Sequence, residues 1–428
     1  MDQREEGRRR GREAAKAKAK DVLRLMEQQF NFAWGLWPSL EGVDLAQMLR
    51  DYDRERLACE PDYTKFPELR GLVDRHVGER EGFREASGLD ETAVAFHYSW
   101  QFLAWRRITA HHAPYWDRAP SIAECTNVFF PEGNEGVTIS DNRDLGVHPF
   151  WKRHLKNWRP GDGDSTWGSV DHWHQGGASS YVELDEDPKC CFPCDPDEFC
   201  PQQEAWDDVN VRIEFMTRYC DFWGPGNRIW IDRHHNAVAV EKTNCRMAVR
   251  RPDVAGAICI TACSYLDPEI HAFKQECLRK VMAAKGETEE DSLDWSFDVG
   301  AHKRYQRLRK LTDAEAAKPG GATLWGALEI VADEAVPYPE RICLSGHDDP
   351  HNKAPTYSML QHAGVMTGPR RRWLYRTLED FDNPSPITTK KLKLLLADGV
   401  EMQPEWQADI DAGRYELGPN TPPVIRNL

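Results

Sequence analysis

The clearest alternation of apolar and polar positions lies between residues 125 and 145, where two strand-like runs flank a glycine-rich turn. Residues 126–130 are rich in β-branched and aromatic side chains, and residues 137–140 alternate as a second strand. The sequence PEGNEG, residues 131–136, separates them and supplies two glycines that tolerate positive φ. This pattern predicts a β-hairpin.

A cysteine opens this hairpin and a polar cluster closes it. A hairpin pairs residues symmetrically about its turn, so we expect Cys125 to lie across from about residue 142. Its neighbours are then Asp141, Asn142, Arg143 and Asp144. A nearby guanidinium favours the thiolate, and carboxylates and amides orient the groups beside them. The alternative is a half-buried cysteine at a strand end, with turn residues closing the hairpin.

Patterns with helical spacing occupy most of the first 110 residues. Residues 7–30 predict a helix with one apolar face, and residues 67–88 predict a second. Residues 90–112 predict a third helix, for which Asp90 is the expected N-cap.

The later part of the chain alternates between strand and helix patterns. Residues 227–251 predict two strands around an RHHN turn, and residues 255–266 predict another. Residues 301–333 predict helices, and residues 340–377 predict strands, with a hairpin through TGPR. Residues 147–225 are rich in Trp, Gly and Asp and show no clear period. Helices, antiparallel strands, helices and strands in this order predict an α+β fold with helices layered on antiparallel sheets.

Composition narrows the classes of function. A chain of 428 residues can bury a large core, as one domain or two. Its net charge of −15 argues against a nucleic-acid partner and against binding to an anionic membrane surface. No run of about 18 apolar residues predicts a membrane span. The first twenty residues are charged and lack a secretory signal, so the twelve cysteines indicate reduced thiols in the cytoplasm.

Four segments, taken in order, carry a family resemblance. GRRRGREAAKAKAKDVL contains two glycines four residues apart, Gly7 and Gly11, and residues 67–98 join two helical patterns through a glycine-rich joint. ECTNVFFPEGNEGVTISDNRDLG is the hairpin, and residues 228–269 and 340–360 hold the later strand patterns. Together they resemble the acyl-coenzyme A:6-aminopenicillanic acid acyltransferase family of autoproteolytic N-terminal nucleophile (Ntn) hydrolases.

The resemblance implies a fold, a cleavage site and roles for several residues. It implies a four-layer αββα sandwich and cleavage of the Glu124–Cys125 bond by Cys125 itself. Asp144 matches the family's Asp at the end of the hairpin, an organiser of the cysteine amine and of cleavage. Asn142 matches a structural Asn, whereas Arg143 stands where the family often has an aromatic residue, so its role is inferred from its charge.

The chemistry of such a site is self-consistent. The thiol attacks the preceding carbonyl, the peptide becomes a thioester, and water releases it. Cys125 then carries a free α-amine, whose pKa of about 7.7–8.0 makes it a usable base at neutral pH. The expected substrate is a small-molecule amide or an acyl-coenzyme A, and the two chains produced are expected to form an α/β heterodimer. Transfer of the acyl group from Cys125 to water gives hydrolysis, and transfer to an amine gives an acyltransferase.

Two departures from the family stand out. The family usually has Thr-Asn-His where this chain has Thr261, Ala262 and Cys263, so the side chain that helps to hold the oxyanion is replaced. Losing one such donor typically costs about 10²–10³ in rate, unless Asn244 or a backbone N–H substitutes. This motivates the alternative of a catalytically degenerate binding or scaffold protein. The family also has a strand before the first glycine, but only six residues precede Gly7, so either the chain start is misannotated or this member lacks that strand.

A zinc-stabilised module is a further alternative. KCCFPCDPDEFC, residues 189–200, holds one C-x-x-C pair, although a second regular pair is absent. The simpler interpretation is a loop insertion with reduced thiols, and no other cofactor is expected. The candidate zinc ligands are Cys190, Cys191, Cys194, Cys200, His172 and His174. Other histidines in predicted turns, where solvated side chains are the usual case, are His111, His112, His234, His235, His347 and His351.

These observations define an expected organisation. Residues 1–124 form a helical N-terminal segment, the candidate α chain, and residues 125–428 form the candidate catalytic β chain. The catalytic part contains a divergent insertion at about 147–225 and a C-terminal extension at about 380–428.

Overall fold

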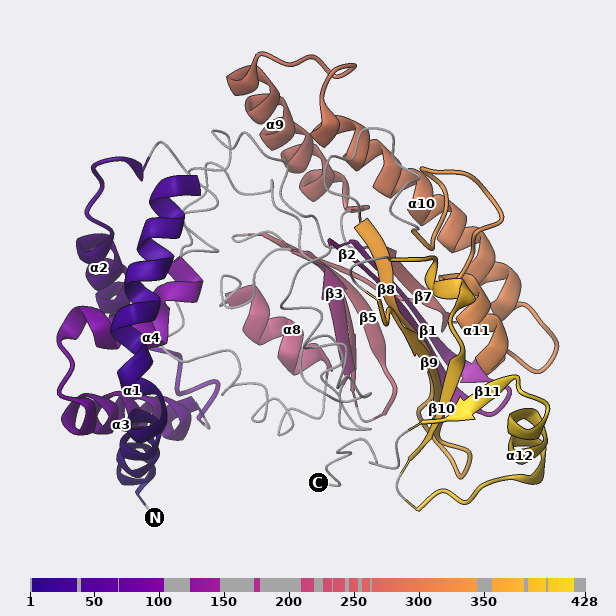
Figure 1. Ribbon diagram of the computed structural model, residues 1–428, viewed down its shortest axis with the longest axis horizontal. Coiled ribbons are helices and arrows are strands. Elements are labelled where there is room, and N and C mark those ends of the chain that lie inside the picture. Colours follow the sequence, from indigo (N-terminus) through magenta and orange to yellow (C-terminus); the bar gives the residue numbers. More distant parts are fainter. Residues whose placement is uncertain are drawn as a thin grey trace.

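The structure is a computed structural model of the chain (Figure 1). It describes residues 2–36, 40–67, 69–103, 124–146, 173–177, 209–218, 226–232, 234–242, 246–252, 256–261, 264–344, 356–380, 384–397 and 399–418.

The predicted hairpin is present. Strand β1 (Glu124–Gly133) pairs with β2 (Gly136–Gly146) in antiparallel register, with Cys125 opposite Arg143. The partner of Cys125 is thus one residue later than expected. The strands also run further into PEGNEG than expected, and Gly136 adopts a φ of +133°, which favours glycine.

β1 and β2 are interior strands of the larger sheet, sheet A. Its order is β11-β10-β9-β8-β2-β1-β7, and only β10 and β11 pair in parallel. The other strands are β7 (Ile258–Thr261), β8 (Thr356–Val365), β9 (Arg372–Thr377), β10 (Leu392–Leu396) and β11 (Tyr415–Leu417). Part of the expected C-terminal extension therefore adds strands to this sheet.

The second sheet, sheet B, is antiparallel and contains the strands predicted around the RHHN turn, although residues 227–251 hold three strands and not the two that were predicted. Its order is β3-β4-β5-β6. The strands are β3 (Trp173–Gly177), β4 (Gly226–Ile231), β5 (Ala237–Lys242) and β6 (Met247–Arg250).

The strand expected from residue 340 onwards is wrong in its described part. Residues 341–344 form no strand, because the backbone N–H groups of Ile342 and Cys343 both bond to the carbonyl of Asp333. These bonds close a turn and take the place of a sheet ladder.

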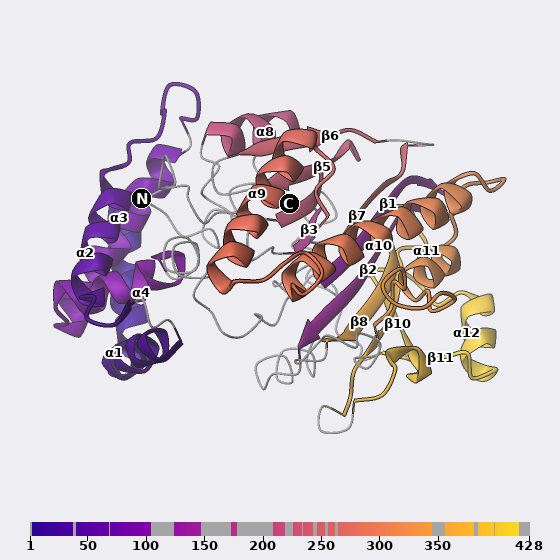
Figure 2. The same ribbon diagram turned by 90° about the horizontal axis from the view of Figure 1, so that it is seen from above.

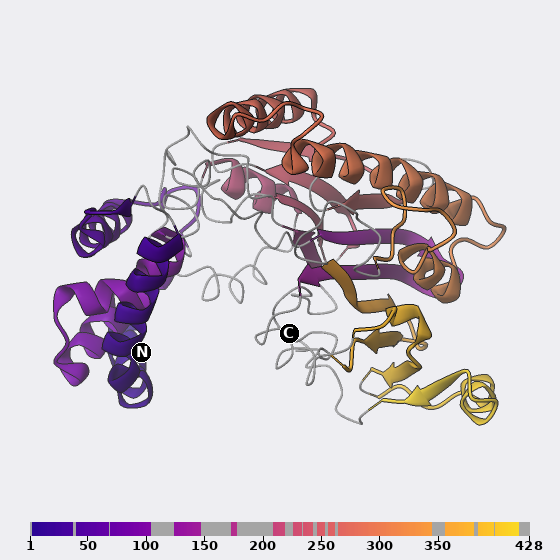
Figure 3. The ribbon, with the colours of Figure 1, turned by 45° about the horizontal axis from the view of Figure 1, so that its top comes forward.

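Two helices in the second half of the chain, α10 (Leu293–Ala316) and α11 (Leu324–Val331), cover one face of sheet A, and Figure 3 shows α10 running along the strands. A third helix, α9 (Pro268–Lys285), packs with Tyr265 and with Ala248 of sheet B. A short helix, η6 (Ile387–Thr389), contacts β8, and α12 (Pro404–Asp411) contacts the edge strand β11. The helices predicted over 301–333 are confirmed, whereas α9 was not expected.

Alternation along β1 explains how these parts pack. Phe129 joins the core between the two sheets, with Ile229 of sheet B. Val128 and Phe130 point the other way and pack against α10 and α11. The outer face of sheet B packs against α8 (Val209–Arg218) and against Phe66, Leu69 and Leu72. The described residues thus form a mixed α+β fold with antiparallel and mixed sheets.

The first hundred residues are helical, as predicted, and lie together on one side of the molecule in both views (Figures 1 and 2). The helices are α1 (Gln3–Leu36), α2 (Leu45–Ala58), α3 (Leu69–Ser87) and α4 (Glu91–Leu103). Asp90 accepts a hydrogen bond from the Ala93 N–H, 2.8 Å, as expected of an N-cap. No helix within the described ranges is long and apolar enough to cross a membrane.

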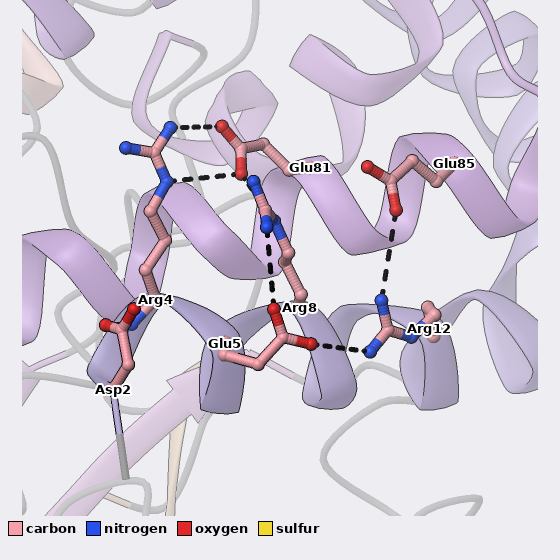
Figure 4. A network of polar contacts seen from close by, with 7 residues as sticks. All are labelled: Asp2, Arg4, Glu5, Arg8, Arg12, Glu81 and Glu85. Carbon is pink, nitrogen blue, oxygen red and sulfur yellow. Dashed lines mark hydrogen bonds and ion pairs between the residues drawn. The ribbon is translucent and has the colours of Figure 1, made fainter.

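Helices α1 and α3 approach each other unusually closely, because glycines line their contact. Gly7 and Gly11 lie against the backbone of α3, and Gly78 and Gly82 lie against the backbone of α1. Ion pairs flank the contact, among them Arg4 and Arg8 with Glu81 (Figure 4). The two glycines noted in the sequence thus serve helix packing.

One side chain ties the two sheets together near the end of β7. The Asn227 Nδ2 of β4 donates to the carbonyls of Thr261, 2.7 Å, and Ser264, 2.6 Å, and is buried. We expect Asn227→Ala to lower the free energy of unfolding by about 1–3 kcal/mol, since it leaves buried carbonyls without their donor. Urea unfolding tests this, with Asn134→Ala at the exposed hairpin turn as control. Equal losses in the two variants would contradict it.

Candidate active site

Cys125 lies on the face of sheet A that looks toward sheet B. Side chains alternate between the two faces of a strand. Phe129 and Ile139 lie in the core between the sheets, and they therefore show which side chains of β1 and β2 face sheet B. Asn127 therefore shares the face of Cys125, and Arg143, directly opposite Cys125, shares it too. Cys125 is reduced, and 7% of its surface is exposed.

Asp141 is the centre of the polar contacts on this face. Its Oδ1 accepts a hydrogen bond from Asn127 Nδ2. Its Oδ2 lies 3.7 Å from Arg143 Nε and 3.4 Å from the Nε2 of His362, which sits directly across from it in β8. Asp141 is 1% exposed and His362 is fully buried. A thiol, a guanidinium, a carboxylate and an imidazole are thus gathered on one buried face.

Asn142 and Asp144 occupy the opposite face, toward the helices. Asn142 Nδ2 donates to Asp144 Oδ1, 2.8 Å, and to the Ile342 carbonyl, 3.2 Å. Ser358 Oγ also donates to Asp144, and Gln361 Nε2 donates to Asn142 Oδ1, 3.1 Å. Of the four predicted catalytic residues, Cys125 and Arg143 therefore share one face of the sheet, and Asn142 and Asp144 share the other.

Asp144 has a perturbed acidity. Burial raises the pKa of its carboxyl to about 8, although hydrogen bonds from Ser358 and Asn142 oppose the shift. In the ladder Asp144 stands opposite Glu124, so the predicted scissile peptide 124–125 lies across from the 143–144 peptide.

Several predicted site residues lie outside the described residues. These are Ala262, Cys263, Asn244, the zinc candidates Cys190, Cys191, Cys194, Cys200 and His172, and His111, His112, His347 and His351. The structure describes the backbone of Glu124 in β1 and of His174 in β3 and no more of these two residues. His234 and His235 lie in the turn between β4 and β5, as predicted. Within the described ranges, no three His, Cys, Asp or Glu side chains are placed to hold a metal ion.

The sequence named Asp141 among the expected neighbours of Cys125 without giving it a role, and it did not point to Asn127 or His362. Asn127 and Asp141 stand two positions along their strands from Cys125 and Arg143, so the alternation rule alone would have found them. His362 comes from a strand more than 200 residues away, and nothing in its local sequence sets it apart.

Comparison with known proteins adds no relative. No family model matches the chain, and no curated protein matches it.

Proposed function

We propose that the chain is a self-processing cysteine Ntn hydrolase or acyltransferase with a four-layer αββα fold. The observation that carries this proposal is the position of Cys125, the second residue of an interior strand, facing Arg143 across the ladder. An Ntn nucleophile needs this position, because cleavage before it leaves a nucleophilic thiol and a new amine anchored in the sheet.

The proposed cleavage begins with the Cys125 thiol. Arg143 favours its thiolate form, which attacks the Glu124 carbonyl carbon. A C–S bond forms, the C–N bond breaks, and the Cys125 nitrogen takes up a proton to become the free amine. Water then hydrolyses the thioester, which leaves a carboxylate on Glu124 and the thiol on Cys125.

We assign Asp144 an indirect role in this step. Its carboxyl group faces the helices, where Asn142 and Ser358 hold it. It thereby fixes the end of β2 opposite Glu124 and keeps the scissile peptide in register. This role differs from direct contact with the thiol.

The mature site would act on a small-molecule amide or an acyl-coenzyme A. The Cys125 amine would accept the proton of its own thiol, and the thiolate would attack the substrate carbonyl to form an acyl-enzyme. Water or an amine would then release the acyl group.

The two chains are expected to remain together after cleavage as an α/β heterodimer. Phe66, Leu69 and Leu72 pack into the outer face of sheet B, and Lys65 pairs with Glu214 of α8. We expect both chains to co-elute in native gel filtration and to separate in denaturant. Separate elution under native conditions would contradict a stable heterodimer.

Hydroxylamine tests the proposed thioester, because it attacks thioesters much faster than amides. Freshly purified protein should be cleaved faster in hydroxylamine, and the residue 1–124 chain should end in a hydroxamate on Glu124. Cys125→Ala should remain whole. Cleavage at another bond, or without hydroxamate, would contradict the mechanism.

A further inference from the structure

The polar groups around Asp141 form a connected cluster on the thiol face. Asn127 comes from β1, Asp141 and Arg143 from β2, and His362 from β8. All four side chains are more than nine-tenths buried. Three strands thus contribute groups that converge on one carboxylate, next to the pair formed by Cys125 and Arg143.

A buried guanidinium needs a counter-charge. Removing one partner of a buried ion pair is strongly destabilising, because the other charge is left uncompensated. Asp141 Oδ2 is within 4 Å of Arg143 Nε, and the Asn127 amide and the His362 imidazole hold this carboxylate from two other directions. Arg143 thus has a structural reason to stay in the sheet interior, opposite Cys125.

We propose that Asp141 is a positioning residue that acts on Cys125 through Arg143, holding the guanidinium opposite the thiol. Asn127 and His362 support it by fixing the carboxylate. This inference rests on the proposed function in taking Cys125 as the nucleophile, but the titration of the thiol can be measured whether or not the chain cleaves itself.

The direction in which Asp141→Asn shifts the titration of Cys125 distinguishes a positioning role from a simple effect of charge. Asp141 is a diagonal neighbour of Cys125, so loss of its negative charge alone would favour the thiolate and move its titration to lower pH. If Asp141 holds Arg143 in place, its loss lets the guanidinium leave the thiol. The titration of Cys125 then moves to higher pH.

The experiment is the rate of Cys125 alkylation by iodoacetamide as a function of pH, read from the labelled peptide by mass spectrometry. Peptides that span Glu124–Cys125 come from uncleaved protein, and peptides that begin at Cys125 come from cleaved protein. Because the two differ in mass, each variant is compared with wild type in the same form, cleaved or uncleaved. We expect Asp141→Asn to raise the pH of half-maximal rate by about one pH unit. In an Arg143→Gln background, the same substitution should lower it or leave it unchanged.

Ser140→Ala is the matched control, because Ser140 is the buried neighbour of Asp141 on the opposite face and its hydroxyl has no hydrogen-bond partner among the described residues. Ser140→Ala should leave the pH dependence of Cys125 alkylation unchanged. If Asp141→Asn does not fold, Asn127→Ser removes a donor to Asp141 without changing charge and should give a smaller shift to higher pH.

Three results would overturn the inference: a shift to lower pH in Asp141→Asn, an equal shift in Ser140→Ala, or no labelling of Cys125 in folded wild type at any pH. Failure of the proposed function is separate, since wild-type protein that never cleaves can still show the expected shifts.

Discussion

Replacing Gly78 by alanine should destabilise the protein by about 3 kcal/mol or more, although alanine normally stabilises a helix by about 1 kcal/mol relative to glycine. A Cβ at Gly78 would overlap the carbonyl oxygen of Arg4, which belongs to the backbone of α1 and cannot rotate away. The helices would have to separate, which would weaken the ion pairs of Arg4 and Arg8 with Glu81 (Figure 4). Urea unfolding monitored by circular dichroism measures the loss.

Gly71→Ala in the same helix is the matched control. Its Cβ would meet only the Gln3 side chain at 3.4 Å, an ordinary contact. It should be neutral or stabilising. Two variants of equal stability would contradict the close approach of α1 and α3.

Asp144→Asn should change how stability depends on pH. The folded protein holds the Asp144 proton up to about pH 8, because burial raises its pKa, whereas the unfolded chain releases it near pH 4. The contribution of Asp144 to the free energy of unfolding is therefore fully present below about pH 4 and is lost as the pH rises through about 8. Asparagine carries no ionisable proton, so Asp144→Asn escapes this loss, and at pH 8–9 its free energy of unfolding should exceed that of wild type. The difference between variant and wild type should change by an amount on the order of several kcal/mol from pH 4 to pH 8–9.

Free energies of unfolding at pH 4, 6 and 8 test this. The exposed carboxylate of Asp411, changed to Asn, is the control and should leave the slope of wild type unchanged. Parallel curves for wild type and Asp144→Asn would contradict a protonated Asp144 in the fold.

The local patterns of the sequence predicted the hairpin and most helices, but one residue of register decided the composition of the site. Pairing of Cys125 with residue 142 would have put Asn142 and Asp144 on the thiol face. The observed pairing with Arg143 puts Arg143 and Asp141 there instead. A shift of one residue moves every side chain of a strand to the other face. Turn composition alone did not fix where the strands end, so it could not fix this parity.

Other differences have separate causes. Helix α9 could have been predicted from its ends, since Asp267 is its N-cap, Pro268 its first residue and Gly286 its C-cap. The contact of His362 with Asp141 joins strands 221 positions apart (362 − 141 = 221), and no local pattern reports such a pairing.

The measurement that tests the central claim most directly is the intact mass of purified protein under denaturing conditions, for wild type, Cys125→Ala and Cys59→Ala. Cys59 is a half-buried cysteine at the end of α2 and serves as the matched control. Self-processing by Cys125 predicts chains of 124 and 304 residues (428 − 124 = 304) in wild type and in Cys59→Ala, and one chain of 428 residues in Cys125→Ala. A single chain in all three, or cleavage that persists in Cys125→Ala, would contradict it.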